Sequence, residues 1–341
     1  MRLDPQKVTL RQVAQEAGVS LKTASRVLND EAHVRPAKEA AVRAAIKRLA
    51  YRPNELARGL KARRSGVIGI IVPFLSHSFM AGCIQAIHHA AADIGFTIMV
   101  SVSNGDPEME AVQIRTLQQH QVEGFIIFPT TNSLQSKSTA ELAGTAVVIV
   151  DQPTHVPEMD SILVANCETA RTVVNHLIEH GYSKIAVIGA NRRLHTISER
   201  IAGYRKAMNA AGYKPIELVP ASEEDLSAAA ICKLFHSPAN RPRAVFTLNS
   251  AASIKALNAI KQSHLRVPED VALFGFDDFD TAEAFQPGIS VVSQPIEEIG
   301  KSAIALFFKH TRQTQKQPGQ KLVFAPKLIL RASCGCNRHP L

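Results

Sequence analysis

A chain of 341 residues is too long for one ordinary domain and provides enough residues for two or three, each with a sizeable core. Its 45% hydrophobic and 20% charged residues are typical of a globular protein and exclude an intrinsically disordered one. The net charge of +9 is concentrated in residues 1–64, which hold 15 Lys and Arg against 6 Asp and Glu, whereas the rest of the chain holds 24 of each sign.

The basic head, residues 1–51, has the periodicity of three short helices. Thr9 and Gln12 have the spacing of a capping box, and an apolar stripe follows at Leu10, Val13, Ala14 and Ala17. Gly18 ends this helix. Ser20 caps a second one, whose inward residues are Ala24, Val27 and Leu28, and a third extends from about residue 36 to 49. A glycine turn between the first two helices predicts a helix-turn-helix unit, and its excess positive charge indicates a polyanionic partner.

The outer face of the second helix carries side chains that can read duplex DNA. Arg26 can bind guanine O6 and N7, Lys22 can reach a base acceptor or a phosphate, and Leu21 can contact a thymine methyl. Hydroxyl and amide side chains of suitable size for phosphate oxygens are Thr9, Thr23, Ser25 and Asn29. For Thr23, a solvated surface position is an equally good interpretation.

Two stretches near the N-terminus carry a family resemblance. "VTLRQVAQEAGVSLKTASRVLND" and then "LAYRPNELARGLKARRSGVIGIIVP" are similar to the start of LacI/GalR-family transcriptional regulators, with Ala24 where that family often has valine. The resemblance extends to the C-terminus. It implies a helix-turn-helix domain at 1–51, a hinge at 52–64 and an effector-binding, dimerising core at 65–335.

Residues 52–64 are too short and too poor in apolar residues to form a stable helix alone in water, and Gly59 lowers helix propensity further. The resemblance implies that this hinge orders in the minor groove, where Leu60 wedges into a base step between Ala57 and Lys61. Leu60 packed against the core is the alternative. Gly59 stands where the family usually has serine, which makes the ordering of the hinge more costly.

From residue 67 onward, short apolar runs alternate with helical patterns, which predicts parallel sheets built from βαβ units. The runs are "GVIGIIVP", "TIMVSV", "GFIIFP", "AVVIVD", "KIAVIG", "RAVFTL" and "VALFGF". The resemblance implies a periplasmic-binding-protein-like core of two doubly wound lobes. The N-lobe is expected at about 65–163 with a C-terminal return at about 291–335, and the C-lobe at about 164–290.

Ligands of open α/β sheets bind beyond the carboxyl ends of the strands, where this chain has polar loops. The resemblance places an effector-binding arginine at Arg200 and a ligand-gripping aspartate at Asp277. It adds Phe79, Phe246, Asn249 and Thr196, and more weakly Ser78 and Asp151. A salt bridge between the lobes is the alternative for Arg200 and Asp277, and a place in the core is the alternative for both phenylalanines.

Two departures from the family pattern remove acidic groups near the expected cleft. Ala165 stands where an aspartate is frequent, and Asn249-Ser250 replaces a frequent Asn-Asp pair. They slightly favour an anionic effector, such as a sugar acid or a sugar phosphate.

No segment approaches 18 uninterrupted apolar residues and the N-terminal stretch has no apolar signal core, so we expect a cytoplasmic protein with no membrane partner. Of five scattered cysteines, only Cys334 and Cys336 are close. A metal or redox role is open for them, but two thiols without nearby partners make a poor zinc site. We therefore expect reduced cysteines, no metal and no cofactor.

The sequence thus predicts a DNA-binding repressor with a near-palindromic operator, controlled by a small-molecule effector such as a sugar or sugar derivative. A short tail without a leucine heptad predicts a homodimer and not a tetramer. An enzyme is the first alternative, but G-x-G-x-x-G, P-loop, H-E-x-x-H and G-x-S-x-G motifs are missing from the sequence. A sugar-binding transport protein is the second, and it would not need a basic head.

Overall fold

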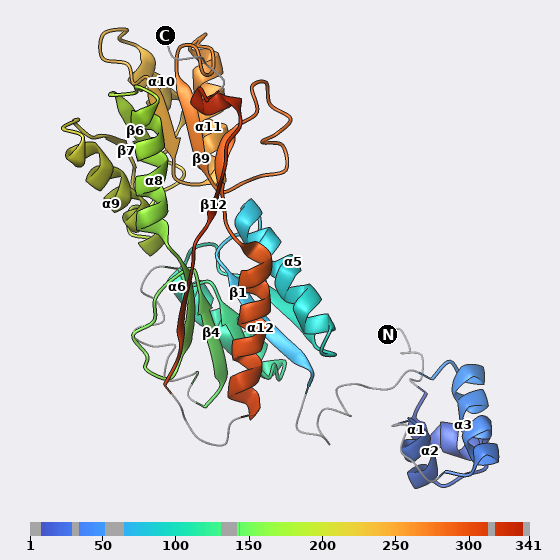
Figure 1. Ribbon diagram of the computed structural model, residues 1–341. Coiled ribbons are helices and arrows are strands. Elements are labelled where there is room, and N and C mark those ends of the chain that lie inside the picture. Colours follow the sequence, from blue (N-terminus) through green and yellow to red (C-terminus); the bar gives the residue numbers. More distant parts are fainter. Residues whose placement is uncertain are drawn as a thin grey trace. The chain divides into compact units, whose positions relative to one another are not determined.

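The computed structural model describes residues 8–28, 34–51, 65–130, 142, 144–312 and 318–336. Its contacts divide the chain into two compact units, residues 1–65 and 66–341 (Figure 1). Among the described residues, no helix is both long enough and apolar enough to cross a membrane.

Within its described residues, the first unit holds three helices, α1 (Leu10–Glu16), α2 (Leu21–Leu28) and α3 (Pro36–Arg48). The predicted capping box is confirmed, because Thr9 N donates to Gln12 Oε1 while Gln12 N donates to the Thr9 hydroxyl. Gly18 has a φ of 63°, a left-handed conformation that lets the chain turn between α1 and α2. A small core closes the unit, with Val13, Ala14, Ala24, Val27, Val42 and Ala45 buried.

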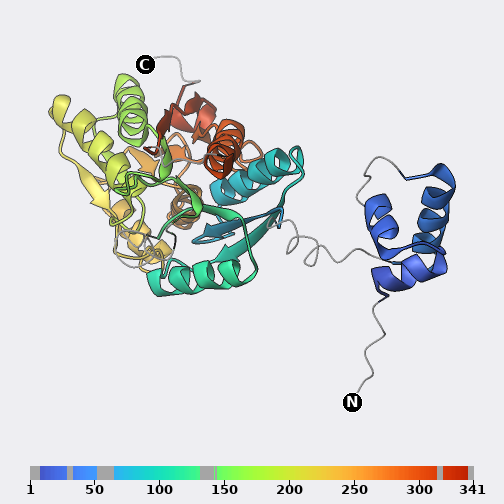
Figure 2. The ribbon, with the colours of Figure 1, turned by 90° about the horizontal axis from the view of Figure 1, so that it is seen from below.

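The second unit contains two parallel-type sheets, each of six described strands. The first has the order β11-β5-β4-β3-β1-β2. Its strands are β1 (Val67–Val72), β2 (Thr97–Val102), β3 (Gly124–Ile127), β4 (Ala146–Val150), β5 (Asp160–Val164) and β11 (Lys321–Phe324). Helices α5 (Ser78–Ala92) and α12 (Ile296–Arg312) cover one face and α6 (Pro107–Gln119) the other, which gives this lobe two apolar layers (Figure 2).

The second sheet has the order β12-β10-β9-β8-β6-β7. Its strands are β6 (Ile185–Ile188), β7 (Ile216–Leu218), β8 (Ala244–Thr247), β9 (Ala272–Phe276), β10 (Ser290–Ser293) and β12 (Lys327–Ile329), of which β12 pairs antiparallel with β10. Helices α8 (Asn166–Glu179) and α9 (His195–Ala210) cover one face, and α10 (Ala228–Phe235) and α11 (Ser250–Gln262) the other. Both lobes therefore have the doubly wound architecture that the sequence predicts.

Within the described residues, the chain passes between the lobes three times, at 164–166, 293–296 and 324–327. The predicted C-terminal return to the N-lobe, placed at about 291–335, was wrong at both ends. Strand β10 at its start and β12 with the 3-10 turn Ala332–Cys334 at its end pack in the C-lobe, and α12 and β11 pack in the N-lobe. The end was misplaced because β12 is a three-residue strand whose antiparallel pairing leaves little pattern in the sequence. The start was misplaced because β10, four residues long, pairs with β9 of the C-lobe before the chain crosses.

Candidate functional site

The exposed residues of α2 are in its N-terminal turn and in the turn that follows. Leu21 is 47% exposed, unusual for a leucine, and Lys22 and Arg26 are exposed beside it. Thr23 and Ser25 are half-buried, whereas Ala24 and Val27 point into the small core. The predicted residues Asn29, Ala57, Leu60 and Lys61 lie outside the described residues. Basic, hydroxyl and apolar side chains together on one exposed helix face can contact bases in a major groove.

Two of the hydroxyls predicted to meet phosphates are already used within the head. Thr9 Oγ1 lies 3.0 Å from Gln12 Oε1 and donates to it, and Thr23 Oγ1 lies 2.9 Å from Ser20 Oγ, which also accepts from Thr23 N as the cap of α2. A hydroxyl has one proton to donate. Thr9 must therefore give up its bond to Gln12 before its hydroxyl can donate to a phosphate oxygen.

A cavity of 440 Å³ lies between the two lobes of the core, at the carboxyl ends of their strands. Of the eight residues predicted to bind an effector, the six that line it are Phe79, Asp151, Thr196, Arg200, Asn249 and Asp277. Loops after β1, β3 and β4 contribute one wall, and α9 with the loops after β7, β8 and β9 contributes the other. The geometry brings residues more than 190 positions apart in the sequence to one polar cavity.

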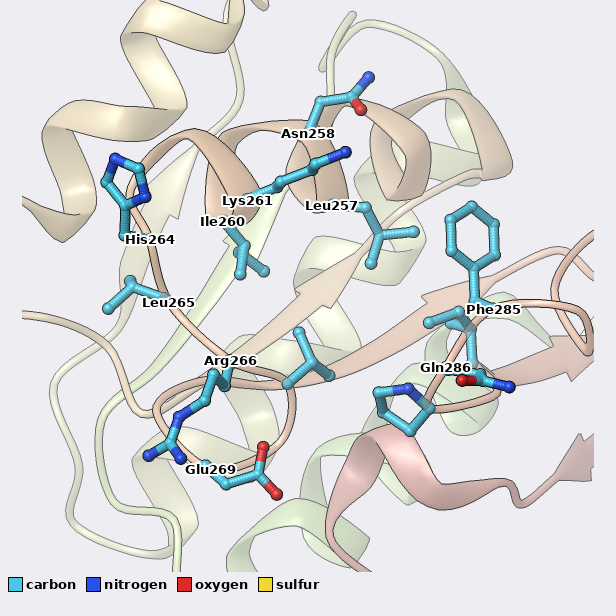
Figure 3. A pocket seen from close by; sticks show the side chains of 13 residues that line it. Leu257, Asn258, Ile260, Lys261, His264, Leu265, Arg266, Glu269, Phe285 and Gln286 are labelled. Carbon is cyan, nitrogen blue, oxygen red and sulfur yellow. The ribbon is translucent and has the colours of Figure 1, made fainter.

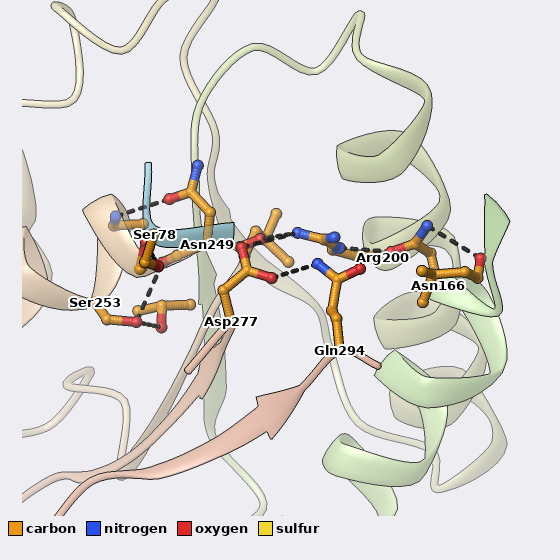
Figure 4. Close-up of polar contacts among 12 residues, drawn as sticks. Ser78, Asn166, Arg200, Asn249, Ser253, Asp277 and Gln294 are labelled. Carbon is orange, nitrogen blue, oxygen red and sulfur yellow. Dashed lines mark hydrogen bonds and ion pairs between the residues drawn. The ribbon is translucent and has the colours of Figure 1, made fainter. Parts of the chain in front are cut away.

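Arg200 is buried at the bottom of this cavity and is held from three sides (Figure 4). Its Nε donates to Asn166 Oδ1 at 2.7 Å and its Nη1 to the carbonyl of Leu248 at 2.6 Å. The guanidinium carbon lies 3.6 Å from the centre of the Phe276 ring, a cation–π arrangement. Burial lowers the pKa of Arg200, and the nearby carboxylates of Asp277 and Asp151 oppose that shift. The side chain is thus fixed in place before any ligand arrives.

Asp277 lies directly after β9 with a φ of 70°, and this turn brings its carboxylate toward Arg200. Its Oδ2 is 3.8 Å from Arg200 Nη1, and its Oδ1 accepts from Gln294 Nε2 at 2.5 Å (Figure 4). Both members of this pair belong to the C-lobe. Asp277 follows β9, a strand of the second sheet, and Arg200 is in α9, which packs on that sheet. The alternative interpretation of the two residues as a salt bridge between lobes was therefore wrong.

Asp151 is the residue of the N-lobe that corresponds in position to Asp277, following β4 with a φ of 69°. Its Oδ1 is buried and has no hydrogen-bond partner among the described residues. Burial raises the pKa of Asp151 to about 7, with Arg200 opposing the shift and Asp277 adding to it. Since a buried carboxyl oxygen without a partner is costly, this atom is well suited to bind a ligand hydroxyl.

Two predicted residues do not line the cavity. Phe246 is fully buried in β8 among the core residues of the C-lobe, which is the alternative that the sequence left open. Ser78, at the first position of α5, donates to the carbonyl of Asp278 at 3.1 Å, and its Oγ lies 3.2 Å from Ser250 Oγ. Ser78 therefore joins the N-lobe to the C-lobe at the edge of the cleft.

Asn249 has a structural task beside its place in the cavity wall. Its Oδ1 accepts from Ala252 N at 2.8 Å and so caps α11, and its Nδ2 lies 3.4 Å from Glu223 Oε1. Glu223 in turn faces His77 of the N-lobe, with 3.4 Å between Oε2 and Nε2. The hydrogen bond from His77 lowers the pKa of Glu223 and, reciprocally, raises the pKa of His77 against the effect of burial.

Sequence reasoning missed His77, Glu223, Asn166 and Gln294. His77 and Glu223 belong to different lobes and meet only because the two lobes face each other. Asn166 and Gln294 lie at two of the passages between the lobes, and their signal in the sequence was position alone, directly after "LVA" and "VVS".

A second hollow, of 670 Å³, lies on the C-lobe between the end of α11 and the loop that carries Phe285 (Figure 3). None of the predicted effector residues lines it. Its lining mixes Leu257, Ile260 and Phe285 with the charged side chains of Lys261, Arg266 and Glu269. It lacks the convergence of buried polar groups that marks the cavity between the lobes.

Two family models match this chain, one over the head and one over the core. Residues 9–54 match the model of bacterial regulatory proteins of the lacI family, and residues 174–334 match that of a periplasmic binding protein-like domain. The ribose operon repressor of Escherichia coli (strain K12) is 30% identical over 330 residues, which cover 95% of this chain and 99% of that protein. The chain belongs to the LacI family of bacterial regulatory proteins.

Two further LacI-family proteins are similar over nearly the whole chain. The transcriptional repressor PurR of Aliivibrio fischeri (strain MJ11) is 28% identical over 332 residues, which cover 95% of this chain and 98% of that protein. A crystal structure of the Lac repressor dimer bound to operator and the anti-inducer ONPF superposes with a TM-score of 0.85 at 25% identity, covering 96% of this chain and 99% of that one. The predicted LacI-family membership and fold are therefore confirmed.

Proposed function

We propose that this LacI-family chain is a sequence-specific transcriptional repressor whose affinity for a near-palindromic operator is set by a small polar effector bound between the core lobes. The observation that carries the proposal is the presence, in one chain, of a basic three-helix head and a core cavity with a pre-positioned Arg200–Asp277 pair. Two relatives that match 95% of this chain are named as repressors, which supports the proposal. The protein acts in the cytoplasm as a homodimer, so that two heads meet the two halves of an operator.

In this proposal α2 lies in the major groove with its N-terminal turn against the bases. Arg26 reads a guanine, Lys22 reaches a base acceptor or a phosphate, and exposed Leu21 contacts a thymine methyl. Hydrogen bonds to phosphate oxygens come from Ser25, Thr9, Thr23 and Asn29. Leu60, flanked by Ala57 and Lys61, enters the minor groove and bends the duplex.

The charges of the cavity favour a neutral, hydroxyl-rich effector. Its lining carries four carboxylates, those of Asp151, Glu223, Glu224 and Asp277, against the cation of Arg200 and the imidazole of His77. An anionic ligand would meet this acidic excess at close range, which reverses the slight preference that the loss of two acidic positions suggested. A volume of 440 Å³ is in the lower part of the range of small-molecule sites, about 300–1,000 Å³. A sugar or sugar derivative fits both properties.

Effector and operator are coupled because both depend on the arrangement of the lobes. Ser78 bonds and the His77–Glu223 contact join the lobes in the described arrangement. A ligand that changes this arrangement changes how the two hinge segments of a dimer meet the DNA.

The test is an operator selection from random duplexes with the full-length protein at low salt, followed by affinity measurements with and without effectors. A thermal-shift screen of neutral sugars, sugar acids, sugar phosphates and nucleosides identifies the ligand by its rise in Tm. We expect one palindromic motif, strong salt dependence and a ligand that changes operator affinity. Failure to select any duplex, or turnover of a candidate metabolite, would contradict the proposal.

A further inference from the structure

The fold brings together three side chains that sequence reasoning had left apart. Cys334 and Cys336, beside the C-terminal strand β12, face His176 in the last turn of α8. His176 Nε2 lies 3.5 Å from Cys334 Sγ and 3.3 Å from Cys336 Sγ, and the two sulfurs are 2.6 Å apart. Among the described residues this is the group of histidine, cysteine and carboxylate side chains whose donor atoms converge, all within 4.8 Å.

The backbone around the two cysteines is firmly attached to the C-lobe. The hydroxyl of Ser333 donates to the carbonyl of Leu273 at 2.7 Å and accepts from Ser290 N at 2.8 Å. These bonds hold the residue directly before Cys334 against β9 and β10. Gly335 then adopts a φ of 90°, which turns the chain back and places Cys336 beside Cys334. A Cβ at Gly335 would lie 2.6 Å from the Tyr182 hydroxyl, so a larger residue here would force the Tyr182 side chain to move, and the positive φ also favours glycine.

His176 is fixed independently of the cysteines. Its ring packs edge-on against Phe274 of β9, with 5.8 Å between the ring centres, and it is half-buried. His180, one turn further along the chain, donates from Nδ1 to the His176 carbonyl at 2.8 Å, and the two rings lie tilted at 45° with 4.3 Å between their centres. The imidazole thus projects toward the sulfurs from a rigid helix end.

We propose that His176, Cys334 and Cys336 form a binding site for one thiophilic divalent cation of the zinc type. Two thiolates and an imidazole are the donor set that zinc prefers, with bonds of about 2.3 Å to sulfur and about 2.0 Å to nitrogen. In a tetrahedron with such bonds, nitrogen and sulfur lie about 3.5 Å apart, close to the two distances found here. The sulfurs need about 3.8 Å, so they must separate by about 1 Å, which a rotation of the half-buried Cys336 side chain allows.

The third ligand removes the objection that the sequence raised against a zinc site. Two thiols alone are a poor site, but His176 supplies a nitrogen from a segment 158 residues away. The three residues leave the fourth position of the tetrahedron to water or to another donor. A bound ion would connect the end of α8 to the C-terminal segment, and would stabilise the C-lobe as a ligand that binds only the folded chain.

The test titrates Co²⁺ and then Zn²⁺ into the full-length protein, stripped with a chelator and kept reduced with a phosphine. We expect one Co²⁺ per chain, with the thiolate-to-cobalt absorption and the visible bands of a tetrahedral ion, both removed by excess Zn²⁺. Cys336→Ser and His176→Gln, which change half-buried residues, should each weaken Co²⁺ binding by about 100-fold or more. Cys232→Ser, in α10 of the same lobe, is the matched control and should bind Co²⁺ like the wild type.

Each variant is also examined by circular dichroism and for the rise of Tm with Zn²⁺, so that a folding defect is separated from a lost ligand. Wild-type protein without thiolate-to-cobalt absorption would overturn the proposal. So would absorption that survives in both Cys336→Ser and His176→Gln. A mass 2 Da below that of the reduced chain under the same reducing conditions would show that the two cysteines form a disulfide instead, and would also overturn it.

Discussion

Arg200 and Asp277 face each other within the C-lobe, with 3.8 Å between Nη1 and Oδ2, so this ion pair does not cross the cleft. Each residue has a further partner at a passage between the lobes, Asn166 for Arg200 and Gln294 for Asp277. Their charges offset each other in a buried setting, since the guanidinium is 4% exposed and the carboxylate 9%. The pair is therefore prepared to bind a ligand and does not by itself close the cleft.

Asp277→Ala should abolish the response to the effector while operator binding persists. The change removes one ligand contact and leaves the Arg200 charge without its carboxylate, so the effector should bind at least about tenfold more weakly. The measurement is operator affinity as a function of effector concentration, together with calorimetric effector binding. Asp270→Ala, which breaks the exposed pair with Arg266 on the same lobe, is the control and should keep the response. A full response in Asp277→Ala would show that the cavity does not bind the effector.

Asp151 should make stability depend on pH. Its pKa of about 7 in the folded protein lies above the ordinary value of 3.8, so the folded chain holds this proton to higher pH than the unfolded chain does. The free energy of unfolding should therefore fall as pH rises from about 4 through 7. Asp151→Asn should remove this slope and stabilise the protein at pH 8 by up to about 4 kcal/mol, since one pKa unit corresponds to about 1.4 kcal/mol. Denaturant unfolding between pH 5 and pH 8 measures it, with exposed Asp280→Asn as a control that leaves the slope in place.

His77 and Glu223 should stabilise contact between the lobes only within a pH window. The pKa of His77 is raised, so its contribution is complete below the ordinary value of 6.5 and disappears as pH rises through the higher folded value. The pKa of Glu223 is lowered, so its contribution requires pH above the ordinary value of 4.5 and is lost as pH falls through the depressed one. Because both groups are partly exposed, the pair contributes about 0.5 kcal/mol.

Glu223→Gln should therefore flatten the loss of stability between pH 6 and pH 8, and His77→Gln should do the same. The double variant tests coupling, since the two single effects should not add. Additive effects would show that the two side chains do not interact in solution. Arg205→Gln, which breaks a pair with Glu217 inside the C-lobe, is the control for a general charge effect.

Arg26→Ala should relax base preference at one position of each half-site. Loss of a bidentate guanine contact costs about 1–3 kcal/mol against the preferred base and little against the others. Selections with wild type and variant, compared position by position, measure the change. Arg48→Ala on α3, whose guanidinium pairs with Glu16, should leave the preference as it was. An unchanged motif in Arg26→Ala would remove this residue from the base-reading surface.

The fold was predictable where an element has a continuous apolar run or a clear local backbone requirement. All seven apolar runs became strands, and the cap at Thr9 and the turn at Gly18 were evident because each satisfies a local backbone requirement. Five strands were missed. Strands β7, β11 and β12 are short and only partly buried, so their sequences lack a continuous apolar run. Strands β5 and β10 are buried, but polar residues at their ends leave only two or three consecutive apolar residues in each.

The site was less predictable than the fold. Arg200 follows from family resemblance, and Asp277 and Asp151 follow also from their place directly after strands. The buried position of Phe246 depends on which way one side chain of β8 points. Asn166 and Gln294 were not predictable, because their role comes from neighbours far away in the sequence. The same is true of His176, whose spacing from Cys334 carries no motif.

The three passages between the lobes have a mechanical consequence for regulation. Three chain segments connect the lobes in the described part of the chain, so we expect the lobes to move as two bodies that turn about these segments and do not separate. Asn166 and Gln294 lie at two of these segments, and each grips one member of the Arg200–Asp277 pair. A ligand that displaces the guanidinium or the carboxylate therefore acts close to the connecting segments. A small rotation there moves the distant ends of the lobes by a larger distance.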